Sequence, residues 1–176
     1  MAGQYDNIFL IGFMGAGKST VGRRLARQLG YDFADLDQLI VAREGRSIPE
    51  IFSVQGETYF RDCETAVLIE QSRVKQTVFA TGGGIVGREE NRAFLKHHGK
   101  TIYLRSTWPT LVARLEKGSG RPLADPEKGW DSIRRLWESR LPWYEEADLI
   151  VDTDHLRVHD VVRQIIFRLG MKELVS

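Results

Sequence analysis

Short apolar runs alternate along this chain with longer stretches whose apolar residues recur at helical spacing. Five runs are bounded by turn residues, and we predict strands at 8–11, within 31–35, and at 77–81, 101–104 and 148–152. We predict helices at 20–29, from 39 to about 45, from about 48, and at 57–73, 89–98, 108–116, 130–141 and 158–169. This alternation favours an α/β fold, in which a five-stranded parallel sheet is flanked by helices on both faces.

One long segment interrupts the pattern. Glycines and prolines at Gly118, Gly120, Pro122, Pro126 and Gly129 leave no helical or strand period there. We therefore predict a mobile lid at about 117–129, and we expect three tryptophans, at 108, 130 and 137, to pack the helices that flank it. A chain of 176 residues suits one domain of ordinary size, so we expect a single domain over residues 1–176.

The first strand leads into a glycine-rich loop at residues 12–19, and a helix follows. The loop has the form G-x-x-x-x-G-K-[ST], whose backbone N–H groups surround a phosphate chain at the positive end of the helix dipole. In this pattern Lys18 reaches the outer phosphates of a nucleotide, and the hydroxyl of Ser19 holds Mg²⁺. A tight connection without a ligand is the alternative, but all four fixed positions and both flanks match a phosphate-binding loop.

Composition limits the classes of partner. The chain has 25 Lys and Arg against 24 Asp and Glu, and this net charge of +1 argues against a nucleic-acid binder held by bulk charge. Cys63 is the only cysteine, which excludes an intrachain disulfide and suits a reducing compartment. The first six residues are mostly polar, and no apolar stretch reaches the about 18 residues that a membrane span needs. We expect a cytoplasmic protein with no nucleic-acid or membrane partner.

Two further groups of residues are expected at the carboxyl ends of strands, where parallel sheets bind their ligands. Asp35 and Asp37 end the second predicted strand, and a run of three glycines, Gly82, Gly83 and Gly84, follows the third. Because side chains alternate along a strand, we expect both aspartates on one side of it, facing the same crevice as the phosphate loop. The alternative is that both are solvated residues that cap the next helix.

Three arginines are candidates for anion contacts. Arg61 and Arg140 carry planar forks that suit a carboxylate, and Glu64 lies at i+3 from Arg61, where it can orient that side chain. Arg121 lies in the predicted lid, from which a cation can swing over a transferring phosphate. For each arginine the alternative is an ordinary solvated charge.

The order of these motifs resembles the shikimate kinase family. The matching segments, which cover nearly the whole chain, are 12–19, Asp35-Leu36-Asp37, Phe60-Arg61-Asp62-Cys63-Glu64, Thr81-Gly82-Gly83-Gly84, Gly120-Arg121-Pro122-Leu123, and Arg140 followed by Pro142 and 144–148. The resemblance implies a P-loop kinase of the nucleoside monophosphate kinase type. It implies ATP-dependent phosphorylation of the 3-hydroxyl of shikimate, a step of the shikimate pathway to chorismate and the aromatic amino acids.

The resemblance also implies a role for each site residue. Lys18, Asp37 and Arg121 are the implied catalytic residues, with Asp37 as a base or a partner of the substrate hydroxyls. Those implied for ATP are Gly15, Ala16, Gly17, Lys18, Ser19, Thr20, Arg114 and Arg121, with Arg114 on the adenine ring opposite a loop at 153–155. Those implied for shikimate are Asp37, Arg61, Gly82, Gly83, Gly84 and Arg140; Ser19 and, through water, Asp35 would hold Mg²⁺.

Two other functions remain to be tested against this one. A kinase for another polyol acid such as gluconate shares the phosphate loop and the size. A nucleotide-gated switch without an acceptor is the second, although the N-K-x-D and D-x-x-G motifs of switch GTPases are absent from the sequence. The resemblance favours the shikimate kinase over both, and we expect a monomer.

Overall fold

The protein is described here by a computed structural model, which covers residues 5–117 and 129–172. Five strands form one sheet in the order β2-β3-β1-β4-β5, and all four pairings are parallel. The strands are β1 (Asn7–Ile11), β2 (Asp32–Asp35), β3 (Thr77–Ala80), β4 (Lys100–Arg105) and β5 (Leu149–Asp152). The five predicted strands are confirmed, with ends that differ by at most one residue.

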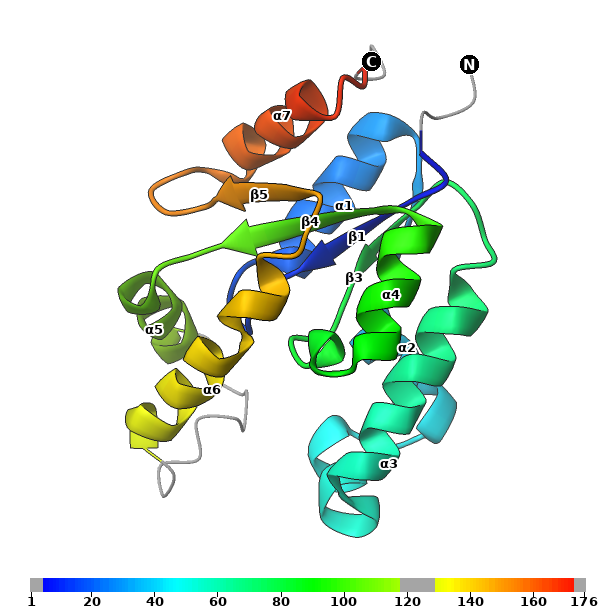
Figure 1. Cartoon of the computed structure of the whole chain (residues 1–176), viewed down its shortest axis with the longest axis vertical. Helices are drawn as coiled ribbons and strands as arrows, with labels where there is room; N and C mark the ends of the chain where they lie inside the picture. The colour runs from blue at the N-terminus through cyan, green and yellow to red at the C-terminus, as the bar shows by residue number, and fades with distance from the viewer. Residues whose placement is uncertain (1–4, 118–128, 173–176) are drawn as a thin grey trace.

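Helices cover both faces of this sheet (Figure 1). They are α1 (Lys18–Leu29), α2 (Leu36–Glu44), α3 (Ile48–Gln71), the short 3₁₀ helix η1 (Ile85–Gly87), α4 (Glu89–His98), α5 (Trp108–Lys117), α6 (Gly129–Tyr144) and α7 (Val158–Arg168). Helices α1 and α7 pack against each other on one face, and α4 packs on β4 at the other. The predicted fold class, a parallel sheet between two helical layers, is confirmed.

Residues 8–11 form an unbroken apolar run because they belong to β1, the central strand of the sheet. Ile8, Phe9 and Leu10 are fully buried, because each face of β1 lies under helices. The ring of Phe9 stacks on that of Phe79 in the neighbouring strand, with 5.2 Å between the ring centroids. The hydrophobic core therefore runs through the middle of the sheet. This packing fixes where each strand ends relative to its neighbours.

Helix α3 contains the break that the sequence indicates. Ser47 and Glu50 form a capping box at its start, with the Ser47 N–H donating to Glu50 Oε2 at 2.7 Å. Gly56 interrupts the helical backbone with a φ of 84°, in the left-handed region that favours glycine. The predicted pair of helices, one from about residue 48 and one from 57, is confirmed as two parts of one kinked element.

The end of β2 corrects one prediction. Strand β2 ends at Asp35 and α2 begins at Leu36, so Asp37 lies in the first turn of a helix, not on the strand. Asp35 Oδ1 accepts hydrogen bonds from the backbone N–H groups of Asp37 at 3.1 Å and Gln38 at 3.3 Å. The expectation that both aspartates share one face of a strand is wrong, because capping by Asp35 starts the helix immediately.

The predicted lid falls almost entirely on residues 118–128, which lie outside the described residues, and so does Arg121. The helices on either side, α5 and α6, are held together by tryptophans, as expected. Trp108 lies 6.1 Å from Trp130 and 5.6 Å from Trp137 between ring centroids. These contacts pack the start of α5 against α6.

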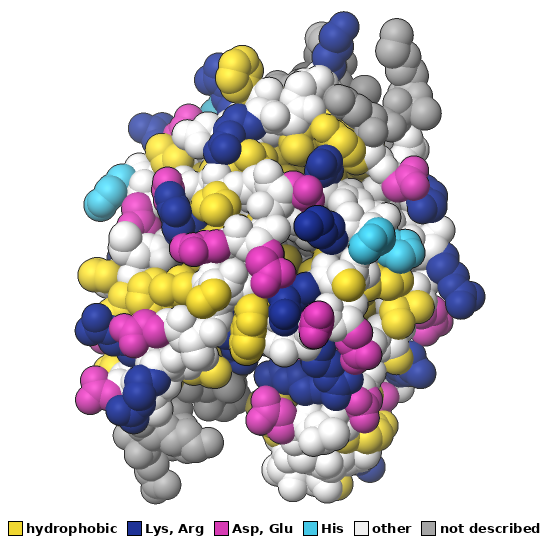
Figure 2. Space-filling model, in the orientation of Figure 1, with side chains coloured by type: hydrophobic (Ala, Val, Ile, Leu, Met, Phe, Trp, Pro, Cys, Tyr) yellow, Lys and Arg dark blue, Asp and Glu magenta, His cyan; other side chains and the backbone are white. Residues whose placement is uncertain are grey.

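The surface agrees with the balanced composition. On the face that Figure 2 shows, basic and acidic side chains are intermixed. Within residues 5–117 and 129–172, no helix has both the length and the apolar character needed to cross a membrane.

Candidate active site

The glycine-rich loop joins β1 to α1 at the carboxyl edge of the sheet. Gly15 and Gly17 have φ values of 81° and 92°, which an L-residue rarely adopts, and Gly17 directly precedes the first turn of α1. Lys18 Nζ donates to the carbonyl oxygens of Gly12 at 2.7 Å and Phe13 at 3.0 Å. The loop therefore curls around the lysine, with the N-terminus of α1 directed at the same space.

Arg114, the predicted adenine neighbour, links the loop to the strands on its other side. Its guanidinium donates to the carbonyl oxygens of Gly15 at 3.3 Å and Ala16 at 3.4 Å, and to Ser106 Oγ at 3.1 Å. It also bonds the carbonyl oxygen of Thr153 at 3.3 Å. Ser106 was missed by the sequence analysis, although its position directly after β4 is the signal that could have identified it.

A hydroxyl and a carboxylate meet where a metal ion is expected. Ser19 Oγ lies 2.5 Å from Asp35 Oδ2, so the start of α1 and the end of β2 contribute adjacent oxygens. Mg²⁺ prefers hard oxygen ligands and usually takes only one or two from a protein, the rest coming from phosphates and water. The two oxygens of Ser19 and Asp35 therefore fit Mg²⁺ that is held together with a nucleotide. Among the described residues no three His, Cys, Asp or Glu side chains cluster as a metal site.

Arg61 lies on the second half of α3 between two carboxylates. Its Nη1 donates to Glu64 Oε2, and its Nη2 and Nε donate to Glu57 Oε1 at 3.2 and 3.3 Å. The Glu64 side chain is 2 % exposed and that of Arg61 is 18 % exposed, so the alternative of a freely solvated arginine is wrong here. The predicted contact with Glu64 is confirmed.

The glycine run after β3 passes directly over these side chains. A Cβ at Gly84 would overlap the guanidinium of Arg61. A Cβ at Gly82 would lie 2.5 Å from Glu64 Oε1 and 2.9 Å from Asp37 Oδ1. These positions need glycine because the turn lies against side chains from α2 and α3. The structure therefore brings together groups that lie far apart in sequence.

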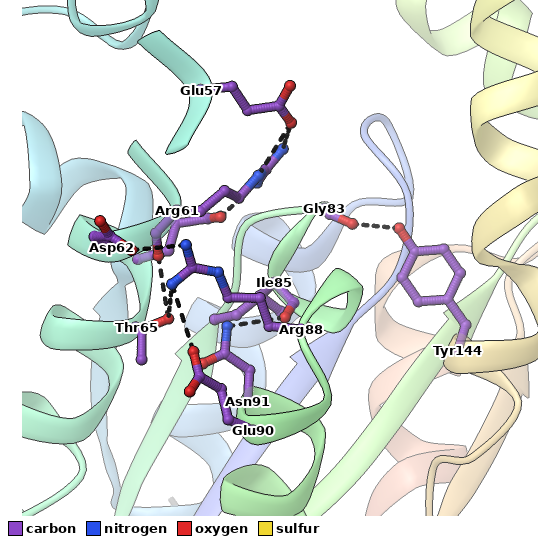
Figure 3. Close-up of polar contacts among 11 residues, drawn as sticks. Glu57, Arg61, Asp62, Thr65, Gly83, Ile85, Arg88, Glu90, Asn91 and Tyr144 are labelled. Carbon is purple, nitrogen blue, oxygen red and sulfur yellow. Dashed lines mark hydrogen bonds and ion pairs between the residues drawn. The ribbon is translucent and has the colours of Figure 1, made fainter. Parts of the chain in front are cut away.

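Arg140 completes the group from α6. It is only 8 % exposed, and its Cζ lies 5.8 Å from the centroid of the Phe13 ring in the glycine-rich loop. One turn later, the hydroxyl of Tyr144 donates to the carbonyl oxygen of Gly83 at 2.5 Å (Figure 3). The sequence analysis gave Tyr144 no role, although it belongs to the same motif as Arg140.

The surroundings of Glu64 raise the pKa of its carboxyl group. Burial raises the pKa of this carboxyl, the nearby charge of Asp37 raises it further, and Arg61 and Arg140 lower it. Its Oε1 is buried and accepts no hydrogen bond from the described residues. An acceptor oxygen of this kind next to Gly82 is suited to a proton donor that enters the pocket.

A second arginine fastens the glycine turn to α3. Arg88, at the end of η1, donates to Asp62 Oδ1 at 2.7 Å and to Thr65 Oγ1 at 3.3 Å, and Thr65 in turn donates to the carbonyl oxygen of Arg61 at 3.1 Å (Figure 3). The sequence analysis did not single out Arg88. Its contacts hold the turn and the arginine helix in one arrangement.

The phosphate-binding loop and the arginines of α3 and α6 lie at the same edge of the sheet, and together they are what the transfer of a phosphoryl group to a small anionic acceptor needs. The fold and the site thus define a P-loop kinase for small molecules. The model of the shikimate kinase family matches residues 14–169 of the chain. The chain belongs to the shikimate kinase family.

Individual relatives agree with this assignment. The shikimate kinase of Chromobacterium violaceum is 45 % identical over 167 residues, which are 93 % of this chain and 89 % of the relative. That of Thermodesulfovibrio yellowstonii is 42 % identical over 160 residues, which are 91 % of this chain and 92 % of the relative. Among solved structures, shikimate kinase from Acinetobacter baumannii in complex with shikimate superposes with a TM-score of 0.88 at 40 % identity, over 94 % of this chain and 93 % of that one.

More distant structures share the fold alone. A gluconokinase from Sinorhizobium meliloti superposes with a TM-score of 0.61 at 18 % identity, over 94 % of this chain and 91 % of that one. This likeness extends to the sheet and its helices and carries no statement about the acceptor.

Proposed function

We propose that this chain transfers the γ-phosphate of ATP to the 3-hydroxyl of shikimate, giving shikimate 3-phosphate and ADP in the pathway to chorismate. The observation that carries the proposal is the position of the buried Arg140 and the half-buried Arg61 near a glycine turn, at the sheet edge that holds the phosphate loop. Two guanidinium groups that are largely shielded from water suit an acceptor that bears a carboxylate. Membership of the family supports shikimate as that acceptor.

On the nucleotide side, we propose that ATP is bound by residues 15–20, with Lys18 on the transferring phosphate and Arg114 beside the adenine. The hydrogen bonds from Arg114 to Gly15 and Ala16 support this, since they hold its guanidinium at the loop. Ser19 and, through water, Asp35 would hold Mg²⁺. The ion, when bound, supplies positive charge that offsets the charge of the phosphate oxygens. Arg121 is proposed to add a second cation, on the sequence resemblance alone.

On the acceptor side, Arg61, Arg140 and the backbone of Gly82, Gly83 and Gly84 would hold shikimate. Asp37 would accept the proton of the reacting hydroxyl, or polarise it, as that oxygen attacks phosphorus and ADP leaves. Its position supports this role, because Asp37 Oδ1 lies close to Gly82. Positioning of the two substrates, with exclusion of water by the proposed lid, would supply most of the acceleration.

We further propose that the enzyme is a single-domain monomer in the cytoplasm, with no nucleic-acid or membrane partner. The single buried thiol of Cys63 suits a reducing compartment. Light scattering on the purified protein measures the mass directly, and a dimer would contradict this part.

ADP release, measured with ATP, Mg²⁺ and one acceptor at a time, tests the function. Shikimate is expected to stimulate release strongly, while gluconate and an uncharged polyol leave it at background. Stronger stimulation by gluconate would favour the polyol-acid alternative. Hydrolysis that no acceptor changes would instead favour a nucleotide switch.

A further inference from the structure

Glu57 makes a contact at the acceptor pocket that the proposed reaction does not use. It begins the second half of α3, four residues before Arg61, and its Oε1 accepts from both Nε and Nη2 of that arginine, at 3.3 and 3.2 Å (Figure 3). This edge of a guanidinium group is one that binds a carboxylate through two hydrogen bonds. A carboxylate of the chain thus occupies an edge of the arginine that is suited to the carboxylate of an acceptor.

The charges around the proposed acceptor pocket determine how strongly it attracts an anionic acceptor, and the contact between Glu57 and Arg61 weakens that attraction. Arg61 and Arg140 supply two positive charges. Against them lie three carboxyl groups, Glu57, Glu64 and Asp37, of which Glu64 and Asp37 flank Gly82. With Glu57 bound to Arg61, the attraction of the pocket for a further carboxylate is reduced.

Of these three groups, Glu57 is the one that an incoming ligand displaces most easily. Its side chain is 67 % exposed, whereas that of Glu64 is 2 % exposed. Exposed ion pairs at i,i+4 are weak, because water competes for both partners. A ligand with several contacts in the pocket therefore displaces Glu57. A ligand that offers only a carboxylate gains little binding free energy by doing so.

We propose that Glu57 is a specificity-determining residue, which competes with the acceptor carboxylate for Arg61 and so excludes small carboxylates that lack other contacts in the pocket. The assignment rests on the proposed function, since it takes Arg61 as the carboxylate partner. A built-in repulsive element of this kind raises specificity at the expense of affinity.

The test compares Glu57→Gln with a matched control on the same helix. Glu70→Gln removes one charge from a residue that is 61 % exposed and pairs with Arg43 at 3.2 Å, the same separation as in the Glu57 pair. Isothermal titration calorimetry at low salt gives the dissociation constants for shikimate and for benzoate, a ring carboxylate without hydroxyls. We expect Glu57→Gln to lower both constants about two- to fivefold, more for benzoate, while Glu70→Gln leaves them at the wild-type values.

Two results of this titration would overturn the proposal. Weaker binding in Glu57→Gln would mean that Glu57 orients Arg61 for the acceptor, and unchanged binding would mean that the contact has no role; both overturn the proposal. Glu57→Ala, which removes the contact together with the charge, should give the same increase in affinity, and a thermal melt checks that each variant folds. If wild-type protein does not phosphorylate shikimate, the proposed function fails separately, because the benzoate titration needs no turnover.

Discussion

Buried charge is concentrated at the proposed acceptor pocket. Among the described residues, the charged residues that are buried are Glu64 and Arg140, and both lie there. Taking a charge out of water costs several kcal/mol unless a partner of opposite charge compensates it, so such groups mark functional sites more often than they stabilise a fold. The carboxylates of Glu64 and Glu57 outweigh the opposing effect of burial and raise the pKa of Arg61, which keeps this guanidinium charged.

Lys18→Ala tests the phosphate loop. The variant should lower turnover about 10²–10³-fold, because a positioned charge on the transferring phosphate is lost. The coupled ADP-release assay measures this effect. Lys75→Ala, which removes an exposed lysine paired with Asp6, is the control and should keep wild-type turnover. Full activity in Lys18→Ala would contradict the assignment of the loop.

Gly84→Ala tests whether the glycine turn makes room for Arg61. The added methyl would overlap the guanidinium, so Arg61 must move and the KM for shikimate should rise about tenfold, as for a lost hydrogen bond to a charged group. The KM for ATP should stay constant. Gly87→Ala is the matched control in the same segment, because its Cβ would meet nothing closer than 3.9 Å. Equal effects of the two variants would contradict the role of Gly84.

Among the helices, α6 contacts both the phosphate loop, through Arg140, and the glycine turn, through Tyr144. The helix begins at Gly129, directly after the predicted lid, and carries Arg140 and Tyr144 on its last turns. The bond from Tyr144 to Gly83 ties its end to the glycine turn, and the Tyr144 ring stacks on Tyr103 with 5.0 Å between centroids. The distance from Arg140 to the turn is therefore set by a contact between distant segments.

Tyr144→Phe isolates this hydrogen bond, since the ring and its packing remain. We expect the KM for shikimate to rise several-fold and kcat to change little, with a stability loss of about 1 kcal/mol. Steady-state kinetics for each substrate and thermal melts supply the measurements. Tyr103→Phe removes the hydroxyl from the ring that stacks on Tyr144 and should leave both KM values unchanged. A loss of stability with no change in the KM for shikimate would make Tyr144 purely structural.

At the scale of the whole molecule, the parallel sheet sets where chemistry and stability lie. Its carboxyl edge holds the proposed site. At the opposite edge Asp148 joins the starts of β4 and β5, and its Oδ2 accepts from the backbone N–H and the hydroxyl of Thr101, both at 2.8 Å. Burial alone would raise the pKa of Asp148, but the bonds from Thr101 and the charge of Lys100 outweigh it, so the pKa is lowered from 3.8.

Asp148→Asn should therefore change the response to acid. A carboxyl whose pKa is lowered by folding stabilises the protein above the unfolded pKa of about 3.8, and this stabilisation is lost as pH falls through the lower folded pKa. The variant should lose about 1.5 kcal/mol at neutral pH, and the difference from wild type should shrink below about pH 3.8. Urea unfolding at several pH values measures both. Asp32→Asn, at an exposed residue of β2, is the control. A difference that does not depend on pH would contradict the linkage.

The helices, the strands and the phosphate loop could be predicted from the order of residues alone, because they depend on neighbouring residues. Apolar runs marked the strands, Ser47 and Glu50 marked a helix start, and glycines supplied the left-handed turns of the loop. One local prediction was wrong: Asp37 lies on a helix, since Asp35 caps it directly.

The folded chain was needed to show which charges are buried and which carboxylates surround Arg61. Glu64, Arg140 and Tyr144 are buried through the approach of α3, α6 and the glycine turn, and no local pattern encodes that approach. Burial and electrostatic environment depend on packing between segments that are distant in the chain, so a local pattern cannot predict them. The same packing joins Arg114 to Ser106 and Thr153, which follow two different strands.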